Sequence, residues 1–159
     1  ELEFRGRRRE VMAPGHYTEL FFLDEATALA VGHRPCFECR RSDALRFASL
    51  WAQAEGLAER ARAPHMDGIL HQQRIWPDGT KRTVEVRLGE LPDGSIVRFE
   101  GNPHLWLGGA LRPWTPAGYL AGVRVGGDII AHLLTPPAIV EVLRLGYRPR
   151  IHPSAGLAG

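Results

Sequence analysis

Apolar side chains in the first half of the chain recur at intervals of three and four residues, which is the spacing of one face of a helix. The residues in this pattern are Leu45, Phe47, Leu50, Trp51, Ala54 and Leu57. Ser42 or Asp43 can cap the start of such a helix, and Pro64 limits its end. The pattern therefore predicts one amphipathic helix between these residues.

The segment before this helix predicts a strand followed by a short helix. The run from Thr18 to Leu23 is typical of a buried strand. Asp24 suits the N-cap of a helix over Glu25–Val31, and Gly32 suits the position after its end. Pro35 then keeps the following corner extended.

Beyond the amphipathic helix, the spacing of apolar residues changes to two, as in strands. The expected strands cover residues 83–88, 95–100, 105–107, 111–114, 119–125 and 128–134. A short helix over Asp67–Arg74 and a turn over residues 76–79 precede them. A last helix is expected from Pro136 to Gly146, with Thr135 as its cap.

These elements predict an α+β fold with two modules. We expect a small αβ module over residues 1–62 and a β-rich antiparallel module with a C-terminal helix over residues 83–150. Residues 63–82 would connect the modules, and residues 151–159 would form a flexible tail.

Composition indicates a globular protein, because 44% of the residues are hydrophobic and the net charge is only +2. No apolar run reaches the length of a membrane span. The chain begins at Glu1 within a strand-like run, so we expect further residues upstream. Two cysteines, without a secretory signal, favour a cytoplasmic protein over a disulfide framework.

Both cysteines lie in one short motif, Cys36-Phe37-Glu38-Cys39. Three interpretations fit this spacing. A thioredoxin-like redox pair would also place such a motif at a helix start, but the alternation of strands and helices typical of that fold is missing. Two ordinary, unlinked cysteines form the second interpretation. The third, which we favour, is that both thiolates bind one Zn²⁺ ion, which needs two further ligands.

The order of elements around the motif carries a family resemblance. Residues 18–41 contain an expected strand and then a short helix with the sequence Ala28-Leu29-Ala30-Val31-Gly32. These are followed by His33-Arg34-Pro35-Cys36 and by a second cysteine with an arginine after it. This segment resembles the second half of the zinc-binding domain of Ada-type methylated-DNA repair proteins. The resemblance implies that Cys36 and Cys39 are the second pair of zinc ligands, and that the N-terminal module is an Ada-like zinc-binding module.

The chain also departs from that family. The other two ligands of the Ada-type domain are cysteines that precede the strand, one of them the methyl-accepting nucleophile, and residues 1–17 contain no cysteine. Methyl transfer by that route is therefore not supported. His16 is the best candidate for the third ligand, with His33 as the runner-up. A cysteine upstream of Glu1 could supply the fourth.

Arginines gather near the proposed zinc corner and suggest a nucleic-acid surface. The residues concerned are Arg7, Arg8, Arg9, Arg34, Arg40 and Arg41. Arginine contacts phosphate with two parallel hydrogen bonds, so two such runs held by zinc would suit DNA or RNA. Each run alone is also typical of a solvated surface. We expect a structural zinc in a protein of DNA repair, restriction or transcription.

Two other functions stay open. His65, Asp67 and His71 suggest metal or acid–base chemistry in a nucleic-acid-processing enzyme, although Asp67 and His71 alone have the four-residue spacing that puts them on one helix face. Aromatic residues of the β-rich module suggest a protein-interaction surface instead. These aromatic residues are Trp106, Trp114 and Tyr119, which at strand spacing are more often core residues.

Overall fold

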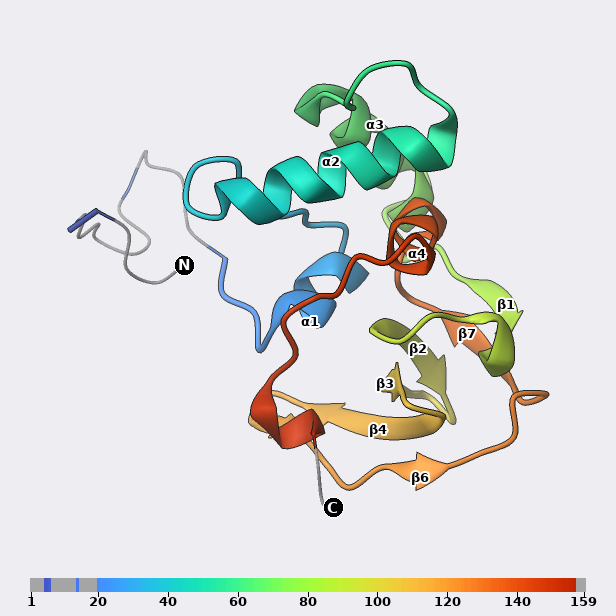
Figure 1. Cartoon of the computed structure of the whole chain (residues 1–159). Coiled ribbons are helices and arrows are strands. Elements are labelled where there is room, and N and C mark those ends of the chain that lie inside the picture. Colours follow the sequence, from blue (N-terminus) through green and yellow to red (C-terminus); the bar gives the residue numbers. More distant parts are fainter. Residues whose placement is uncertain (1–4, 7–13, 15–19, 157–159) are drawn as a thin grey trace.

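The computed structural model describes residues 5–6, 14 and 20–156 of the chain. It is an α+β structure with a seven-stranded antiparallel sheet and helices packed beside it, which confirms the α+β part of the prediction (Figure 1). The helices are α1 (Glu25–Ala30), α2 (Arg41–Glu55), α3 (Ala63–Arg74) and α4 (Pro137–Arg144), with the short 3₁₀ helices η1 (Leu88–Glu90) and η2 (Pro153–Ala155).

The first helix begins and ends where its local signals predict. The Asp24 carboxylate accepts a hydrogen bond of 2.8 Å from the backbone N–H of Thr27, as an N-cap should. Gly32 follows the last turn with a φ of +82°, a conformation that residues with a Cβ rarely adopt. The preceding segment differs from expectation, because residues 20–23 form no strand and Leu20 and Phe21 are exposed. Thr18 and Glu19 lie outside the described residues.

Helices α2 and α3 both begin earlier than expected. Arg40, rather than Ser42 or Asp43, is the residue before α2, and it makes no side-chain cap. α3 begins at Ala63 instead of Asp67, because Pro64 lies in its first turn, where a missing backbone N–H costs nothing. Of the apolar face predicted for α2, Phe47 and Trp51 are buried, Leu45 and Leu50 are half-buried, and Ala54 and Leu57 are exposed. The buried face of the helix is completed by small residues, Ala44, Ala48 and Ala52.

The seven strands follow the order β1-β7-β2-β3-β4-β5, and β6 also pairs with β4. Their bounds are β1 (Val84–Arg87), β2 (Ser95–Phe99), β3 (Asn102–Leu107), β4 (Ala110–Thr115), β5 (Gly118–Tyr119), β6 (Val123–Arg124) and β7 (Ile130–Leu133). The single strand predicted over residues 119–125 is two short strands that pair with opposite ends of β4.

The helices share one apolar core that takes residues from both predicted modules. Phe47 and Trp51 of α2 and Leu70 of α3 are buried in the same cluster as Ile139 and Leu143 of α4. Figure 1 shows α4 between these helices and the sheet. The two-module division stays a prediction, but α4 gives both segments a common interior.

Two details near the C-terminal end differ from their predicted roles. Thr135 does not cap α4, because its hydroxyl accepts the backbone N–H of Ile96 at 2.9 Å and Pro136 precedes the helix. Residues 151–156, expected within a flexible tail, pack on the fold. The Ser154 hydroxyl accepts the backbone N–H of Tyr119 at 2.8 Å, and Ala155 is buried.

A buried carboxylate joins α1 to the segment that follows α4. Glu25 is only 7% exposed, and its oxygens accept the hydroxyl of Tyr147 at 2.6 Å and the backbone N–H of Arg150 at 2.8 Å. The guanidinium of Arg40 holds both oxygens, at 2.9 and 3.0 Å. Burial, and then the hydrogen bond to Glu25, raise the pKa of Tyr147 above its ordinary range, so this phenol stays a donor.

We predict that Glu25→Ala lowers the free energy of unfolding by about 3 kcal/mol or more, because the buried Tyr147 hydroxyl, the Arg40 guanidinium and the backbone N–H of Arg150 lose their acceptor. Tyr147→Phe removes one of these hydrogen bonds and should cost about 1–3 kcal/mol. Urea denaturation of the variants measures both changes.

Glu141→Ala is the matched control, since Glu141 pairs with Arg144 on the exposed side of α4. That change should cost at most about 1 kcal/mol. Equal losses for Glu25→Ala and Glu141→Ala would contradict the role given to the buried carboxylate.

Candidate functional site

The two cysteines lie in a tight turn between α1 and α2. The backbone N–H of Arg40 donates to the carbonyl of Cys36 at 3.0 Å, which closes the turn. The backbone N–H of Glu38 points to the Cys36 sulfur, with an N···Sγ distance of 3.3 Å. Cys36 is exposed and Cys39 is half-buried, so the turn presents its sulfur atoms near the surface.

This turn favours the thiolate form of Cys36. Partial burial acts to raise the pKa of the thiol, but hydrogen bonds from the backbone of Cys39 and Glu38 and from the Cys39 side chain outweigh it, and the pKa is lowered. The thiolate is the form that binds a metal or acts as a nucleophile.

The candidates for further zinc ligands are not gathered around the cysteines in the described part of the chain. No group of three or more His, Cys, Asp and Glu residues among the described residues is arranged to hold a metal ion. His16 lies outside the described residues, as do Arg7, Arg8 and Arg9. The zinc site therefore stays a prediction for Cys36, Cys39 and His16.

His33, the runner-up ligand, is held by its neighbours in a half-buried position. Its ring lies against Phe22, with the ring centroids 5.0 Å apart. Burial lowers the pKa of His33, the positive charge of Arg74 lowers it further, and Asp67 opposes both. The neutral imidazole that results is the form that can coordinate a metal.

A cleft of about 730 Å³ separates the cysteine turn from α3. Its lining residues are Gly32, His33, Arg34, Cys36, Phe37, Glu38, Ala63, Asp67, Leu70, His71 and Arg74. Two candidate sites that are far apart in the sequence, the cysteine corner and part of the histidine cluster, thus line one cleft.

His65, Asp67 and His71, the residues of the histidine cluster, lie on different faces of α3. Asp67 and His71 line the cleft, whereas His65 is hydrogen-bonded to the carboxylate of Glu55 at 2.7 Å and does not line it. A spacing of four residues puts Asp67 and His71 on one face of α3, and a spacing of two turns His65 away. The catalytic interpretation that needs all three residues receives no support from this arrangement.

Two of the predicted nucleic-acid-binding arginines are engaged within the protein. Arg34 makes two parallel hydrogen bonds of 2.8 Å to Asp67, and its guanidinium lies 5.3 Å from the centre of the Phe37 ring. Arg40 is bound by Glu25 and Asp43, and its side chain is only 15% exposed. Arg41, at the first position of α2, is exposed.

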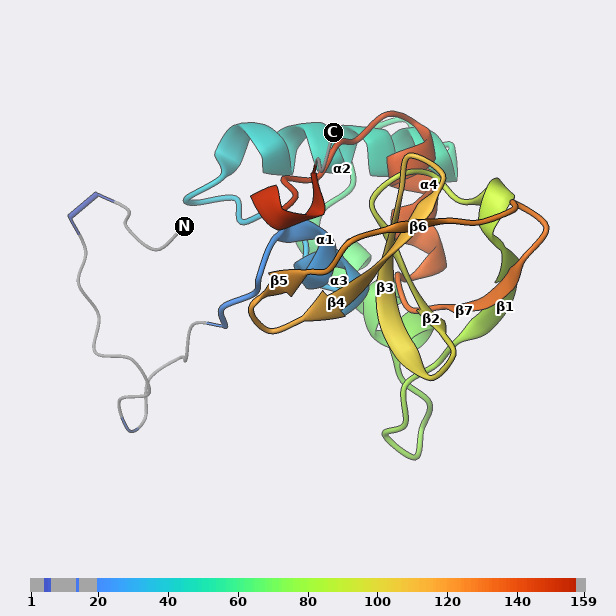
Figure 2. The same ribbon diagram turned by 90° about the horizontal axis from the view of Figure 1, so that it is seen from below.

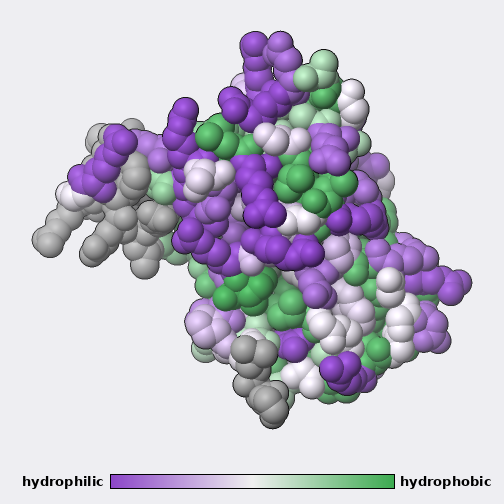
Figure 3. Space-filling model, viewed as in Figure 1, coloured by the Kyte–Doolittle hydropathy of each residue, from purple (hydrophilic) through white to green (hydrophobic). Residues whose placement is uncertain are grey.

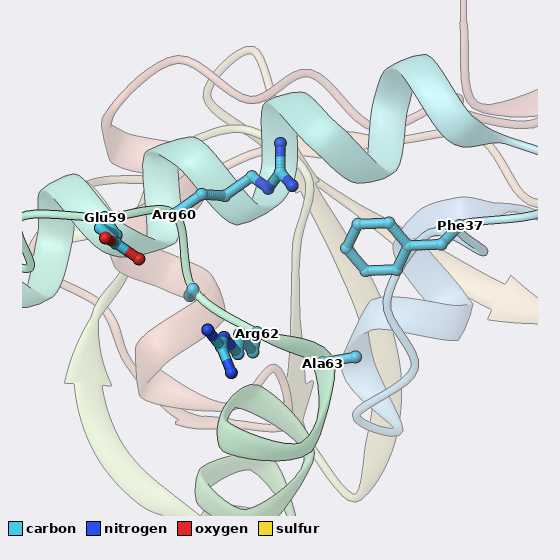
Figure 4. Close-up of a pocket in the computed structure, with 6 residues that line it drawn as sticks. Phe37, Glu59, Arg60, Arg62 and Ala63 are labelled. Atoms are coloured by element: carbon cyan, nitrogen blue, oxygen red, sulfur yellow. The ribbon is translucent and has the colours of Figure 1, made fainter.

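A second pocket, of about 400 Å³, adjoins the cleft and shares Phe37 and Ala63 with it. Arg60 and Arg62, which belong to none of the predicted sites, line this pocket from the loop between α2 and α3. Figure 4 shows the side chains of Arg60 and Phe37 pointing toward one another. The sequence signal that could have identified Arg60 and Arg62 is their alternation with alanine shortly after the apolar pattern of the predicted helix.

The face of the molecule in Figure 1 also carries a hydrophilic band, over the start of α2 and the segment that follows α4 (Figure 3). Arg40 and Asp43, at the start of α2, and Arg150, from the segment after α4, form one network of ion pairs. These ion pairs fix the start of α2.

The aromatic residues proposed for a protein-binding surface are mostly interior. Trp106 is 6% exposed and Tyr119 is 5% exposed, while Trp114 is half-buried with its indole N–H enclosed. Trp76 is 44% exposed and was not predicted as a surface aromatic, because it lies in a turn without periodicity.

The comparisons with protein-family models, with curated proteins and with solved structures found no match to this chain. None of the helices in the described residues is long and apolar enough to cross a membrane. The function must therefore be inferred from the geometry of the chain.

Lys81, the single lysine of the chain, is held by main-chain oxygens beyond the end of α3. Its ammonium group donates to the carbonyls of Ala30 and Leu134, at 2.9 and 2.8 Å. Burial lowers the pKa of Lys81 to about 8, and the positive charge of Arg74 contributes to this shift.

We predict that Lys81 titrates near pH 8 rather than at its ordinary value of 10.5, as followed by NMR of its side-chain carbons. Between these values the unfolded chain binds a proton that the folded protein has lost, so stability should rise with pH across this window. Arg74→Gln should raise the pKa, and Lys81→Met should remove this part of the pH dependence. Titration of Lys81 near its ordinary value would contradict the account of its surroundings.

Proposed function

We propose that this protein binds one structural Zn²⁺ ion through Cys36 and Cys39 and associates with nucleic acid. The observation that supports the metal most directly is the turn in which the Cys36 sulfur accepts a backbone N–H at 3.3 Å. Zinc binds cysteine as the thiolate, so a turn that lowers a thiol pKa reduces the cost of losing the proton. His16 and a cysteine upstream of Glu1 are the proposed remaining ligands, with His33 as the alternative to His16.

The position of the turn suits a structural ion. Cys39 lies two residues before α2, a helix of 15 residues, so an ion bound by the turn would lie at the start of this helix. Zinc bound there would fix the turn to the start of α2 and hold the wall of the cleft that contains Phe37. Its chemical contribution would be this cross-link.

Nucleic-acid binding is supported by the cations around the turn. Arg41 is exposed at the start of α2, and Arg60 and Arg62 line the pocket that adjoins Phe37. Guanidinium groups of this kind bind phosphate without regard to base sequence. The proposed setting is DNA repair, restriction or transcription in the cytoplasm, as the resemblance of residues 18–41 implies.

The metal is tested by measuring zinc in the purified full-length protein. We expect close to one zinc ion per molecule, and we expect Cys36→Ser to lose that ion together with a substantial part of the stability. Ser42→Ala, an exposed change of similar size just after the motif, should keep both. Zinc retained in full by Cys36→Ser would reject the proposal.

Nucleic-acid binding is tested by the dependence of affinity on salt. Binding to a DNA or RNA oligonucleotide should weaken steeply with salt, and Arg41→Ala should reduce the log–log slope by about 0.7 to 0.9 for each phosphate that Arg41 neutralises. Arg144→Ala on α4 is the control, since Arg144 pairs with Glu141.

Arg40→Ala needs a folding measurement beside it, because Arg40 also neutralises the buried Glu25. The nucleic-acid part of the proposal would be rejected if the protein bound no oligonucleotide at low salt. It would also be rejected if Arg41→Ala left the slope of log affinity against log salt concentration unchanged.

A further inference from the structure

A turn closed by hydrogen bonds projects from the molecule between α3 and β1. Ile75 and Lys81 form an isolated antiparallel bridge, and the backbone N–H groups of Trp76 and Gly79 are bonded within the turn at 2.9 Å. The Asp78 carboxylate accepts both the backbone N–H and the hydroxyl of Thr80, at 2.9 and 2.7 Å. In Figure 2 this turn is the light-green loop that extends below the sheet. We call residues 75–82 the Trp76 turn.

An aromatic ring is exposed on this turn, and it belongs to none of the buried clusters of the described residues. Trp76 is 44% exposed, and the guanidinium of Arg82 lies 4.1 Å from the centre of its ring. Arg82 is itself fixed, because its backbone N–H donates to the carbonyl of Arg74 and its guanidinium to the carbonyl of Gln72, both at 2.9 Å. The ring therefore has a supported face and a defined orientation.

The cations at the base of the turn have no carboxylate partner among the described residues. Arg74 donates to the carbonyl of Val31 at 2.8 Å, and Arg82 and Lys81 likewise bond to main-chain oxygens. The carboxylate within the turn, Asp78, keeps its charge but bonds to Thr80 and forms no ion pair with these cations. The lowered pKa of Lys81 reflects, after burial, the proximity of Arg74, so positive charge is concentrated at this place. Such a place attracts phosphate.

An exposed aromatic ring beside cations without carboxylate partners has the chemistry that binds unpaired bases. Each nucleobase can stack on an aromatic face while its phosphate meets a nearby cation, and such stacking tolerates any sequence. In a duplex the base faces are already stacked on one another, so this mode requires a single strand.

We propose that the Trp76 turn binds single-stranded nucleic acid, with a base stacked on Trp76 and the adjoining phosphates near Arg74 and Arg82. This inference rests on the proposed function and names the form of nucleic acid that it takes. Arg74 also lines the cleft beside Cys36, so the Trp76 turn continues the proposed surface rather than forming a separate one.

The test uses the fluorescence of the full chain with a short oligothymidylate at about 50 mM salt. Trp51 and Trp106 are buried, so stacking on Trp76 should quench the solvent-exposed part of the tryptophan emission. Trp76→Leu should abolish this quenching and weaken binding by about tenfold or more, whereas the salt slope should hardly change. Trp76→Phe should keep most of the affinity, because it keeps an aromatic face.

Two controls make the result specific. Trp114→Phe removes the half-buried tryptophan of β4 and should leave the quenching unchanged. A blunt duplex of equal length, and polyglutamate at equal charge, should quench much less than the single strand. Circular dichroism of each variant checks the fold, and the exposed position of Trp76 makes a folding defect unexpected.

The outcomes separate this inference from the function on which it rests. Salt-dependent binding with unchanged fluorescence, or wild-type affinity of Trp76→Leu, would overturn the stacking proposal and leave the proposed function standing. Equal quenching by duplex or by polyglutamate would also overturn it. No binding of any oligonucleotide would reject both.

Discussion

The buried carboxylate of Glu25 is the interaction on which the arrangement of this protein depends. One side chain accepts hydrogen bonds from Arg40, at the start of α2, and from Tyr147 and Arg150, after α4. A carboxylate so far from water is tolerated because a guanidinium and two further donors replace its hydration. The same contacts hold α1 against the segment after α4 and set the position of the turn that ends at Arg40.

That constraint explains why the cysteine turn faces α3. Arg40 follows Cys39 directly, so the ion pair with Glu25 anchors one end of the turn, while α1 ends just before Gly32, near its other end. The Arg34 guanidinium then donates to the Asp67 carboxylate of α3, and both residues line the cleft. Two of the predicted nucleic-acid-binding arginines, Arg34 and Arg40, thereby serve the structure. Arg41, Arg60 and Arg62 are exposed. In the proposed function, zinc would hold the turn that the ion pairs have already placed.

Local signals predicted the elements well, and long-range contacts account for what they missed. Asp24 and Gly32 bound α1 through neighbours in sequence, so its limits were predictable. Arg34 was expected at the surface because its partner Asp67 lies 33 positions away. The tail was expected to be flexible because its composition does not reveal the hydrogen bond between Tyr119 and Ser154. Trp76 has no periodicity that could mark it, and its exposure depends on the shape of the turn. The two cysteines could be identified as candidate zinc ligands from sequence because the signal is their spacing, which involves only neighbouring residues.

The central claim is that both cysteines hold one zinc ion in the folded protein. X-ray absorption spectroscopy at the zinc edge, on the full-length protein, tests this claim most directly because it reports which atoms surround the metal. The account predicts a four-coordinate ion with at least two sulfur neighbours at about 2.3 Å and a nitrogen neighbour at about 2.0–2.1 Å. A spectrum with oxygen and nitrogen neighbours alone would contradict it.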